Sequence, residues 1–200
     1  LHLMARNNEL MNVFESLSLN VANVEVLTLP VRDVKPDILR PIMQAARQQK
    51  RLDVDYVSIN NPDREGRIIV PHTMVYTGLR WHVRAWCEKN QQYRDFVLSR
   101  FRDIPEIMDD SAHGQSGDTE WNTQVTIRII PDPRLTTAQQ DVVQVDYGME
   151  NGALEVGTRG KLVPYALKLL HVDLEERLED PMAQQIIVEN RSELKPWLFG

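Results

Sequence analysis

The spacing of apolar residues predicts one helix followed by several short strands. Apolar side chains recur three and four positions apart within residues 37–49, at Ile38, Ile42 and Ala46 among others, which is typical of an amphipathic helix. From Leu52 onward apolar and polar residues alternate, and this period of two predicts a strand over residues 52–59. Turn residues separate four more strand candidates, at residues 67–71, 73–76, 79–87 and 93–99. Five close strands behind one helix predict a small antiparallel β-barrel or a strongly bent sheet.

Residues 109–120 contain no large apolar side chain and are rich in Gly, Ser and Asp, which predicts a linker. Beyond it the pattern indicates a strand at 124–130, a helix at 135–142, strands near 143–147 and 153–156, and a helix at 163–170. The tail adds a strand at 186–188 and a short helix within 192–199. This order is typical of a compact α+β module. Near the start of the chain we predict a helix around residues 9–17 and note a Val/Leu-rich stretch at 21–29.

The composition is that of a soluble globular protein, since 42% of the 200 residues are hydrophobic and 26% are charged. This length suffices for two small domains that each bury a core. Cys87, the only cysteine, follows an apolar strand, so we interpret it as a core thiol in a reducing, cytoplasmic compartment. No apolar run approaches the roughly 20 residues that cross a bilayer, and the start lacks a signal-peptide pattern. Position 1 is not Met, so we expect a fragment without its N-terminal region.

The net charge of −6 conceals an uneven distribution. Residues 1–35 carry a net −1, residues 36–105 a net +4, and residues 106–200 a net −9. Ten of the twelve cationic side chains in the middle segment are arginines, whose planar guanidinium binds phosphate and stacks on bases. The middle segment is therefore either an anion-binding domain or a surface on which these arginines pair with neighbouring aspartates.

The motifs of common enzymes are missing from the sequence. Gly148, Gly152, Gly157 and Gly160 fit neither a Walker loop nor a dinucleotide-binding fold, and no Gly-x-Ser-x-Gly elbow occurs. The five histidines are dispersed without a His-x-x-x-His pair, so no zinc site is predicted. We therefore predict a protein that is not an enzyme, with no catalytic residue, no metal and no cofactor.

Alternation within residues 80–86 divides one strand into an apolar face and a cationic, aromatic face. The second face carries Arg80, His82, Arg84 and Trp86. Aromatic rings interleaved with arginines suit a nucleotide or a single strand, because the ring stacks on the base and the guanidinium binds the phosphate. The alternative is a solvated outer face, with Trp86 in the core.

The triplet Trp81-His82-Val83 precedes a strand that reads Arg94-Asp95-Phe96-Val97-Leu98-Ser99-Arg100. With these motifs, residues 67–102 resemble the WYL domain, a family named for a Trp-Tyr-Leu triplet that precedes a strand with an R-x-F-x-L-x-R pattern. The similarity covers about residues 37–105, and the half that follows is similar to the C-terminal extension of many WYL proteins. The family implies an SH3-like or Sm-like β-barrel in a bacterial transcription regulator with an N-terminal winged helix-turn-helix. The Pro-His and Trp-His-Val-Arg-Ala variant most resembles the BrxR and CapW regulators of anti-phage defence loci.

This resemblance implies a domain organisation and a set of partners. Residues 1–35 would be a linker and dimerisation segment, 36–108 a ligand-sensing WYL barrel, 109–120 a linker, and 121–200 an α+β extension that dimerises. The protein would be a homodimeric repressor that contacts operator DNA through a missing N-terminal domain, with no membrane partner. Its ligand would be a nucleotide, a cyclic oligonucleotide or a nucleic-acid fragment. The alternative is a module that grips single-stranded nucleic acid through the same face without any switching role.

The ligand-facing positions of the family fall on hydroxyl, imidazole and guanidinium side chains of this chain. They are Tyr56, Ser58, His72, His82, Arg84, Arg94 and Arg100, with Arg67, Arg80 and Arg102 as second-rank candidates. The hydroxyls would form hydrogen bonds, the imidazoles would contact a base edge or phosphate, and the arginines would neutralise phosphate charge.

Overall fold

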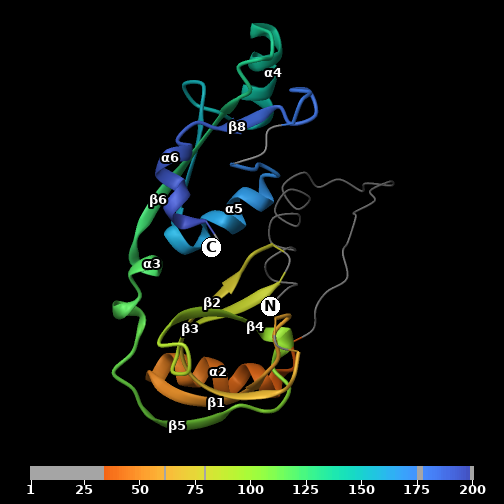
Figure 1. Ribbon diagram of the computed structural model, residues 1–200. Coiled ribbons are helices and arrows are strands. Elements are labelled where there is room, and N and C mark those ends of the chain that lie inside the picture. Colours follow the sequence, from red (N-terminus) through yellow and green to blue (C-terminus); the bar gives the residue numbers. More distant parts are fainter. Residues whose placement is uncertain (1–33, 61, 79, 175–177, 199–200) are drawn as a thin grey trace, which may run out of the picture. The chain divides into compact units, whose positions relative to one another are not determined.

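The computed structural model describes residues 34–60, 62–78, 80–174 and 178–198. The chain divides into two compact units, Leu1–Val34 and Lys35–Gly200, and the second unit contains nearly all of the described residues. The predicted helix around residues 9–17 and the stretch at 21–29 lie outside the described residues, as does most of the segment 1–35. Within the second unit, the two halves each contain one antiparallel sheet (Figure 1).

The first half is a helix packed on a five-stranded sheet. Its elements are α2 (Pro36–Gln48), β1 (Lys50–Tyr56), β2 (Glu65–Tyr76), β3 (Trp81–Cys87), β4 (Gln92–Val97) and β5 (Glu106–Asp110). The strand order is β4-β3-β2-β1-β5, and every neighbouring pair is antiparallel. The predicted α+β class is confirmed. Among the described residues, however, the edge strands β4 and β5 do not pair, so this sheet is not a closed barrel.

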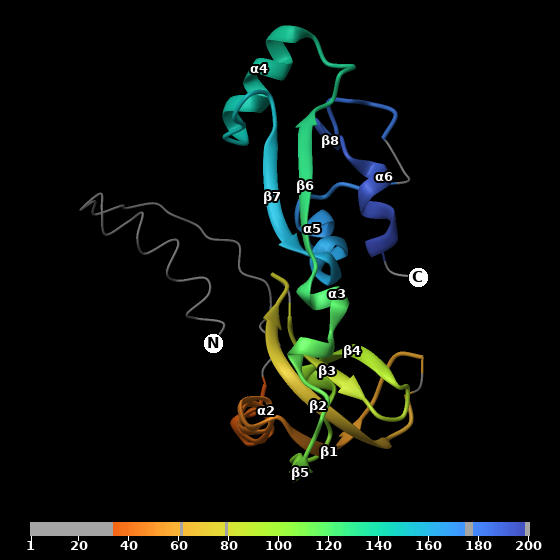
Figure 2. The same ribbon diagram turned by 90° about the vertical axis from the view of Figure 1, so that its left-hand side faces the viewer.

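Helix α2 forms as the apolar spacing predicts. Ile38, Ile42 and Ala45 are its buried residues, and they lie on the face that packs against β1 and β2 (Figure 2). Pro36 suits the first turn, and Gln49 ends the helix in the left-handed conformation. The buried residues of this half include Leu52, Val54, Ile69, Val70, Val83, Ala85 and the predicted core thiol, Cys87.

Strand β2 is continuous where the sequence predicts two strands. Pro71 indicates a break, but the chain continues with a register shift, in which Pro71 pairs with Ala85 and Thr73 pairs with Arg84. His72 is therefore the extra residue of a β-bulge. Bulges re-aim the side chain at which they occur, and this bulge directs His72 toward the connection that leaves the sheet.

The predicted linker, residues 109–120, contains short ordered elements. It completes β5 and continues through the 3₁₀ turn η2 (Gln115–Gly117) into the one-turn helix α3 (Thr119–Asn122). The side chain of Asp118 caps α3 by accepting a hydrogen bond from the Trp121 backbone N–H. Both Asp118 and Trp121 are buried, so this connection is packed against the sheet.

The second half is a three-stranded antiparallel sheet with helices. Its elements are β6 (Gln124–Pro131), α4 (Thr137–Asp146), β7 (Leu154–Arg159), η3 (Gly160–Leu162), α5 (Val163–Leu169), β8 (Ile186–Val188), α6 (Arg191–Leu194) and η4 (Lys195–Trp197). The strand order is β7-β6-β8. One apolar cluster fills this half, and it includes Ile127, Ile129, Val163, Leu167, Val188 and Leu194.

The strand predicted near residues 143–147 is wrong, because α4 continues to Asp146. The β-branched side chains of Val142, Val143 and Val145 favour a strand, but a capping box at the start of α4 favours a helix there. In this box Thr136 and Gln139 each satisfy a backbone N–H of the other. Within the part of the chain that the structure describes, no helix is long and apolar enough to span a membrane.

Candidate ligand-binding site

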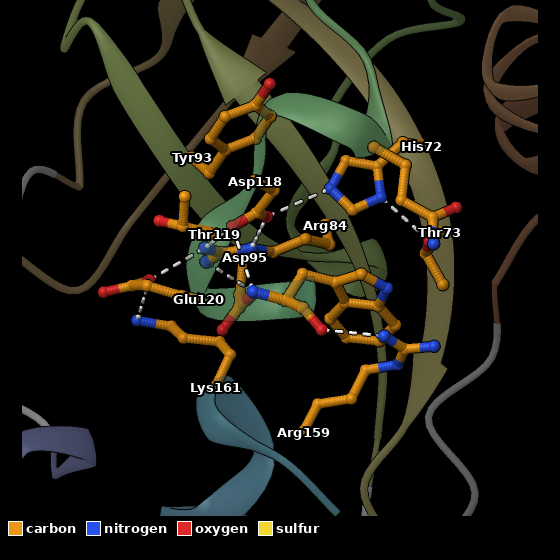
Figure 3. Close-up of polar contacts among 12 residues, drawn as sticks. His72, Thr73, Arg84, Tyr93, Asp95, Asp118, Thr119, Glu120, Arg159 and Lys161 are labelled. Atoms are coloured by element: carbon orange, nitrogen blue, oxygen red, sulfur yellow. Dashed lines mark hydrogen bonds and ion pairs between the residues drawn. The ribbon is translucent and has the colours of Figure 1, made fainter. Parts of the chain in front are cut away.

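A buried cluster joins the first sheet to α3, and Arg84 of β3 is its centre (Figure 3). The Arg84 side chain is 0% exposed. Its Nε donates to one carboxylate oxygen of Asp118 at 2.6 Å, and its Nη2 donates to the other at 3.1 Å. Further bonds reach Asp95 of β4 at 3.3 Å and Glu120 of α3 at 2.9 Å. Three carboxylates from two segments therefore surround one buried guanidinium.

Asp118 also receives the bulged histidine of β2. The Nε2 atom of His72 lies 3.1 Å from the Asp118 carboxylate, while its Nδ1 atom lies 2.8 Å from the Thr73 hydroxyl. Burial alone would raise the pKa of Asp118, but hydrogen bonds from His72 and Arg84 outweigh it and hold this pKa far below its ordinary value. Asp118 is therefore ionised throughout the physiological range. Two side chains that were predicted to face a ligand meet at this internal carboxylate.

An open polar pocket of about 690 Å³ adjoins the cluster. Its wall is built by β3, β4, the η2–α3 connection and the η3–α5 segment, and it includes Arg84, Arg94, Glu120, Lys161 and Tyr165. Glu120 is the exposed carboxylate of the cluster, with 52% of its side chain accessible, and it bridges Arg84 at 2.9 Å and Lys161 at 3.5 Å. Arginine and lysine around one opening suit an anionic ligand.

Tyr165 of α5 contributes a hydroxyl to the same wall. This hydroxyl lies 3.3 Å from the Asp95 carboxylate and donates to it. Burial, together with the Asp95 charge, raises the pKa of Tyr165, so its hydroxyl stays protonated. The pocket therefore combines groups from both halves of the described unit, and its cations are balanced by carboxylates.

The structure places the predicted ligand residues in different surroundings. His72 and Arg84 meet in the buried cluster, and Arg94 is exposed at the pocket. Tyr56 is a core residue whose hydroxyl accepts from the Val97 N–H and whose ring packs edge-on against Phe96 and Phe101. Ser58 and Arg100 are half-buried and do not line the pocket.

The second-rank arginines lie away from the pocket lining. Arg67 is largely buried against the Glu65 carboxylate, and its guanidinium lies 6.0 Å from the Tyr56 ring. Arg102 is exposed and donates to the Ser99 carbonyl. Arg80 is half-buried. Their ligand roles stay predictions.

His82, the middle residue of the Trp-His-Val triplet, is almost fully buried, at 2% exposure. Its ring lies 5.3 Å from the Tyr165 ring, and its Nδ1 atom has no hydrogen-bond partner among the described residues. Burial, reinforced by the positive charges of Arg80 and Arg100, lowers the pKa of His82 to about 4. The imidazole is therefore neutral at pH 7.

The buried His82 predicts a pH-dependent stability. Between its ordinary pKa of 6.5 and its folded pKa of about 4, the unfolded chain binds a proton that the folded chain does not. The stability that the neutral, buried His82 contributes is therefore fully present above pH 6.5 and is lost as the pH falls toward 4. We expect this residue to lower the free energy of unfolding by about 2 kcal/mol between pH 7 and pH 5. Urea unfolding at pH 7 and at pH 5 measures this difference in the free energy of unfolding.

The matched variants for this pH dependence are His82→Gln and His113→Gln, since His113 is an exposed histidine. The His82→Gln variant should lose most of the difference between pH 7 and pH 5, whereas His113→Gln should keep it. An equal pH dependence in His82→Gln and the unmodified chain would show that another group is responsible.

Asp118, Glu120 and Lys161 were missed by reasoning from the sequence. Asp118 and Glu120 lie in the Gly- and Ser-rich segment that reads as a linker, and Lys161 lies in the acidic half. The one available signal is the D-x-x-W spacing of an N-cap before a short helix, at Asp118 and Trp121. Among the described residues, no group of three or more His, Cys, Asp or Glu side chains is placed to hold a metal ion.

Two family models match this chain. Residues 37–105 match the WYL domain, and residues 124–194 match the model described as BrxR transcriptional regulator, C-terminal dimerization domain. Residues 106–123 lie between the two matches, and they contain β5 and the η2–α3 connection, which contributes Asp118 and Glu120 to the cluster.

Curated relatives are similar to this chain over most of its length. The chain is 33% identical over 173 residues to a protein of Stenotrophomonas maltophilia named DNA-binding transcriptional repressor CapW. The matched region covers 86% of this chain and 58% of the relative. Proteins of the same name from Escherichia coli (strain KTE188) and Pseudomonas aeruginosa are each 34% identical over 164 residues, covering 82% of this chain and 54% of the relative. The chain therefore spans little more than half the length of these relatives.

Proposed function

Residues 37–105 belong to the WYL domain family and residues 124–194 to the C-terminal dimerization domain of the BrxR transcriptional regulators, and from this premise we propose that the chain is the ligand-sensing and dimerising part of a DNA-binding transcriptional repressor. The relatives are named repressors, which supports a regulatory role and not a catalytic one. The ligand we propose is a nucleotide or a short nucleic-acid fragment. Operator binding by the whole regulator, and a role at an anti-phage defence locus, are parts of the same proposal.

The observation that carries this proposal is the bridge made by Glu120. This exposed carboxylate contacts Arg84 and Lys161 at the mouth of the pocket, so it occupies cations that an anionic ligand would need. Glu120 belongs to α3, which leads directly into β6 of the dimerization domain. A phosphate that binds in the pocket would compete with Glu120 and loosen α3. Ligand binding would thereby change the connection between the two domains.

Such a change can regulate operator binding only if the ligand prefers one of two arrangements of the dimer. Competition with Glu120 supplies that preference, because the ligand gains contacts with Arg84 and Lys161 only when the bridge is open. The ligand and the bridge are therefore mutually exclusive at these two cations. The repressor would respond to the ligand through this exclusion.

A homodimer is the second part of the proposal, and exposed apolar side chains on α4 support it. Val142 and Val145 lie one turn apart on this helix and are both exposed. Val142 and the exposed Met182 line an apolar groove of about 330 Å³ within residues 124–194, the range that matches the dimerization domain. We propose that a second copy of the chain covers this surface.

The pocket predicts which substitutions alter ligand binding. We expect Lys161→Ala to weaken binding of a 5′-phosphorylated thymidine dinucleotide roughly 10- to 100-fold, since it removes a charge-assisted hydrogen bond. Arg94→Ala should also weaken binding. Glu120→Gln should strengthen it severalfold, because the neutral amide competes less well for the two cations. Isothermal titration calorimetry of the four proteins measures these affinities.

The matched control is Arg47→Ala, which removes an exposed arginine of α2 that does not line the pocket. Its affinity should equal that of the unmodified chain. Equal losses in Arg47→Ala and Lys161→Ala, with a steep salt dependence and affinity that rises with strand length, would instead support a module that grips single strands without switching. Weaker binding by Glu120→Gln would contradict the competition.

A further inference from the structure

An aromatic stack lies at the edge of the pocket. Trp86 of β3 lines the pocket, and the exposed ring of His113 lies flat on its indole, with the ring centres 4.0 Å apart and the planes 7° from parallel. Tyr93 of β4 meets the same indole edge-on, at 5.2 Å and 68°. The Trp86 ring is thus supported from one side by Tyr93 and covered by an imidazole.

The stacked imidazole is held mainly through its backbone. The His113 N–H donates to the Ser111 hydroxyl, and the neighbouring Gly114 carbonyl accepts from the Tyr93 hydroxyl. Within the described parts of the chain the imidazole itself makes no hydrogen bond. Because this exposed five-membered ring has no hydrogen bond to the described residues, a larger aromatic ring can replace it on the indole.

The surroundings of Trp86 suit a nucleobase and not only an anion. Gln91 and Gln92 line the same pocket, and their amides carry both donors and acceptors for the edge of a base. Arg94 and Lys161 line it too and suit a phosphate. Stacking on an aromatic face is tolerant of base identity, whereas amides read the base edge.

We infer that Trp86 is a base-stacking platform and that His113 occupies it when no ligand is bound. The inference rests on the proposed function, and it assigns to the same pocket a ligand with an unpaired base next to a phosphate. The base replaces the imidazole on the indole, and the phosphate meets Arg94 and Lys161. His113 competes with the base for the indole of Trp86, just as Glu120 competes with the phosphate for the cations of the pocket.

The test compares two probes on three proteins. The probes are a 5′-phosphorylated thymidine dinucleotide and the abasic dinucleotide with the same phosphates, and the proteins are the unmodified chain, His113→Ala and Trp86→Leu. We expect His113→Ala to bind the thymidine probe severalfold more tightly and the abasic probe unchanged. Trp86→Leu should bind the thymidine probe about tenfold more weakly and the abasic probe unchanged, because it loses the stacking of one base. Tryptophan fluorescence should be quenched by the thymidine probe and less so in Trp86→Leu.

The outcomes separate this inference from the proposed function. If the unmodified chain binds both probes equally, and His113→Ala changes neither affinity, the pocket takes phosphate without a base, and only the inference is overturned. If the unmodified chain binds neither probe, both are overturned. His113 is exposed, so His113→Ala decides the matter even if Trp86→Leu fails to fold.

Discussion

Replacing Arg84 by Met is expected to destabilise the fold by about 3–5 kcal/mol, because it leaves the Asp118 carboxylate buried without its main ion-pair partner. Both side chains are at most 1% exposed, so water does not compensate the lost partner. His72 and the Trp121 N–H continue to contact Asp118, but they do not replace a bidentate guanidinium. Urea unfolding at pH 7 measures the difference.

A double substitution shows whether the destabilisation comes from the lost ion pair or from lost packing. Arg84→Met combined with Asp118→Leu removes both charges, and we expect it to recover part of the lost stability, because the most deeply buried carboxylate is removed with its partner, while Asp95 keeps the hydrogen bond from the Tyr165 hydroxyl. Arg102→Met, at an exposed arginine whose side chain donates to the Ser99 carbonyl, should leave stability unchanged. If Arg84→Met unfolds at the same urea concentration as the unmodified chain, the cluster does not hold α3 to the sheet.

Replacing Val142 and Val145 by Glu is expected to convert the proposed dimer into monomers. A twofold interface repeats each substitution on both copies, so four carboxylates would face one another across an apolar surface. Loss of central apolar contacts typically costs about 2–4 kcal/mol of binding, which corresponds to roughly 30- to 700-fold weaker association. Light scattering coupled to size-exclusion chromatography measures the molar mass of the variant in solution and so distinguishes a dimer from a monomer.

A close control for the dimer is Ile59→Glu. Ile59 and Val145 are equally exposed, at 80%, but Ile59 lies in the WYL domain and outside residues 124–194. The Ile59→Glu variant should keep the dimer mass, and thermal unfolding should confirm that the Val142 and Val145 variant remains folded. A dimer that survives the double substitution would place the interface elsewhere.

The elements of the first half could be predicted because their apolar residues follow a clear period. Helix α2 and strands β1, β3 and β4 lie where that period indicates them. Strand β5 was missed because it is an edge strand with only two apolar residues, Ile107 and Met108, among acidic ones. The strand near residues 143–147 was predicted wrongly because Val143 and Val145 have β-branched side chains, whereas the capping box that starts α4 favours a helix that continues to Asp146.

The site could be predicted only in part. The resemblance identified His72, Arg84 and Arg94, which are found in the cluster and the pocket. It did not identify Asp118 and Glu120, because a polar segment with two glycines gives no indication that its carboxylates fold back onto β3. Their position follows from the His72 bulge and the short α3 helix, which are tertiary features without a local pattern.

In the proposed mechanism, a ligand in the pocket loosens the α3 connection. Hydrogen exchange, measured with and without a saturating 5′-phosphorylated thymidine dinucleotide, tests this claim at the backbone amides of Trp121 and Asn122, which bond to Asp118. The amides of α2 serve as an internal reference, since this helix does not line the pocket. The proposed loosening predicts faster exchange at Trp121 and Asn122, with exchange in α2 unchanged. Unchanged or slower exchange at these two amides, with the ligand bound, would contradict it.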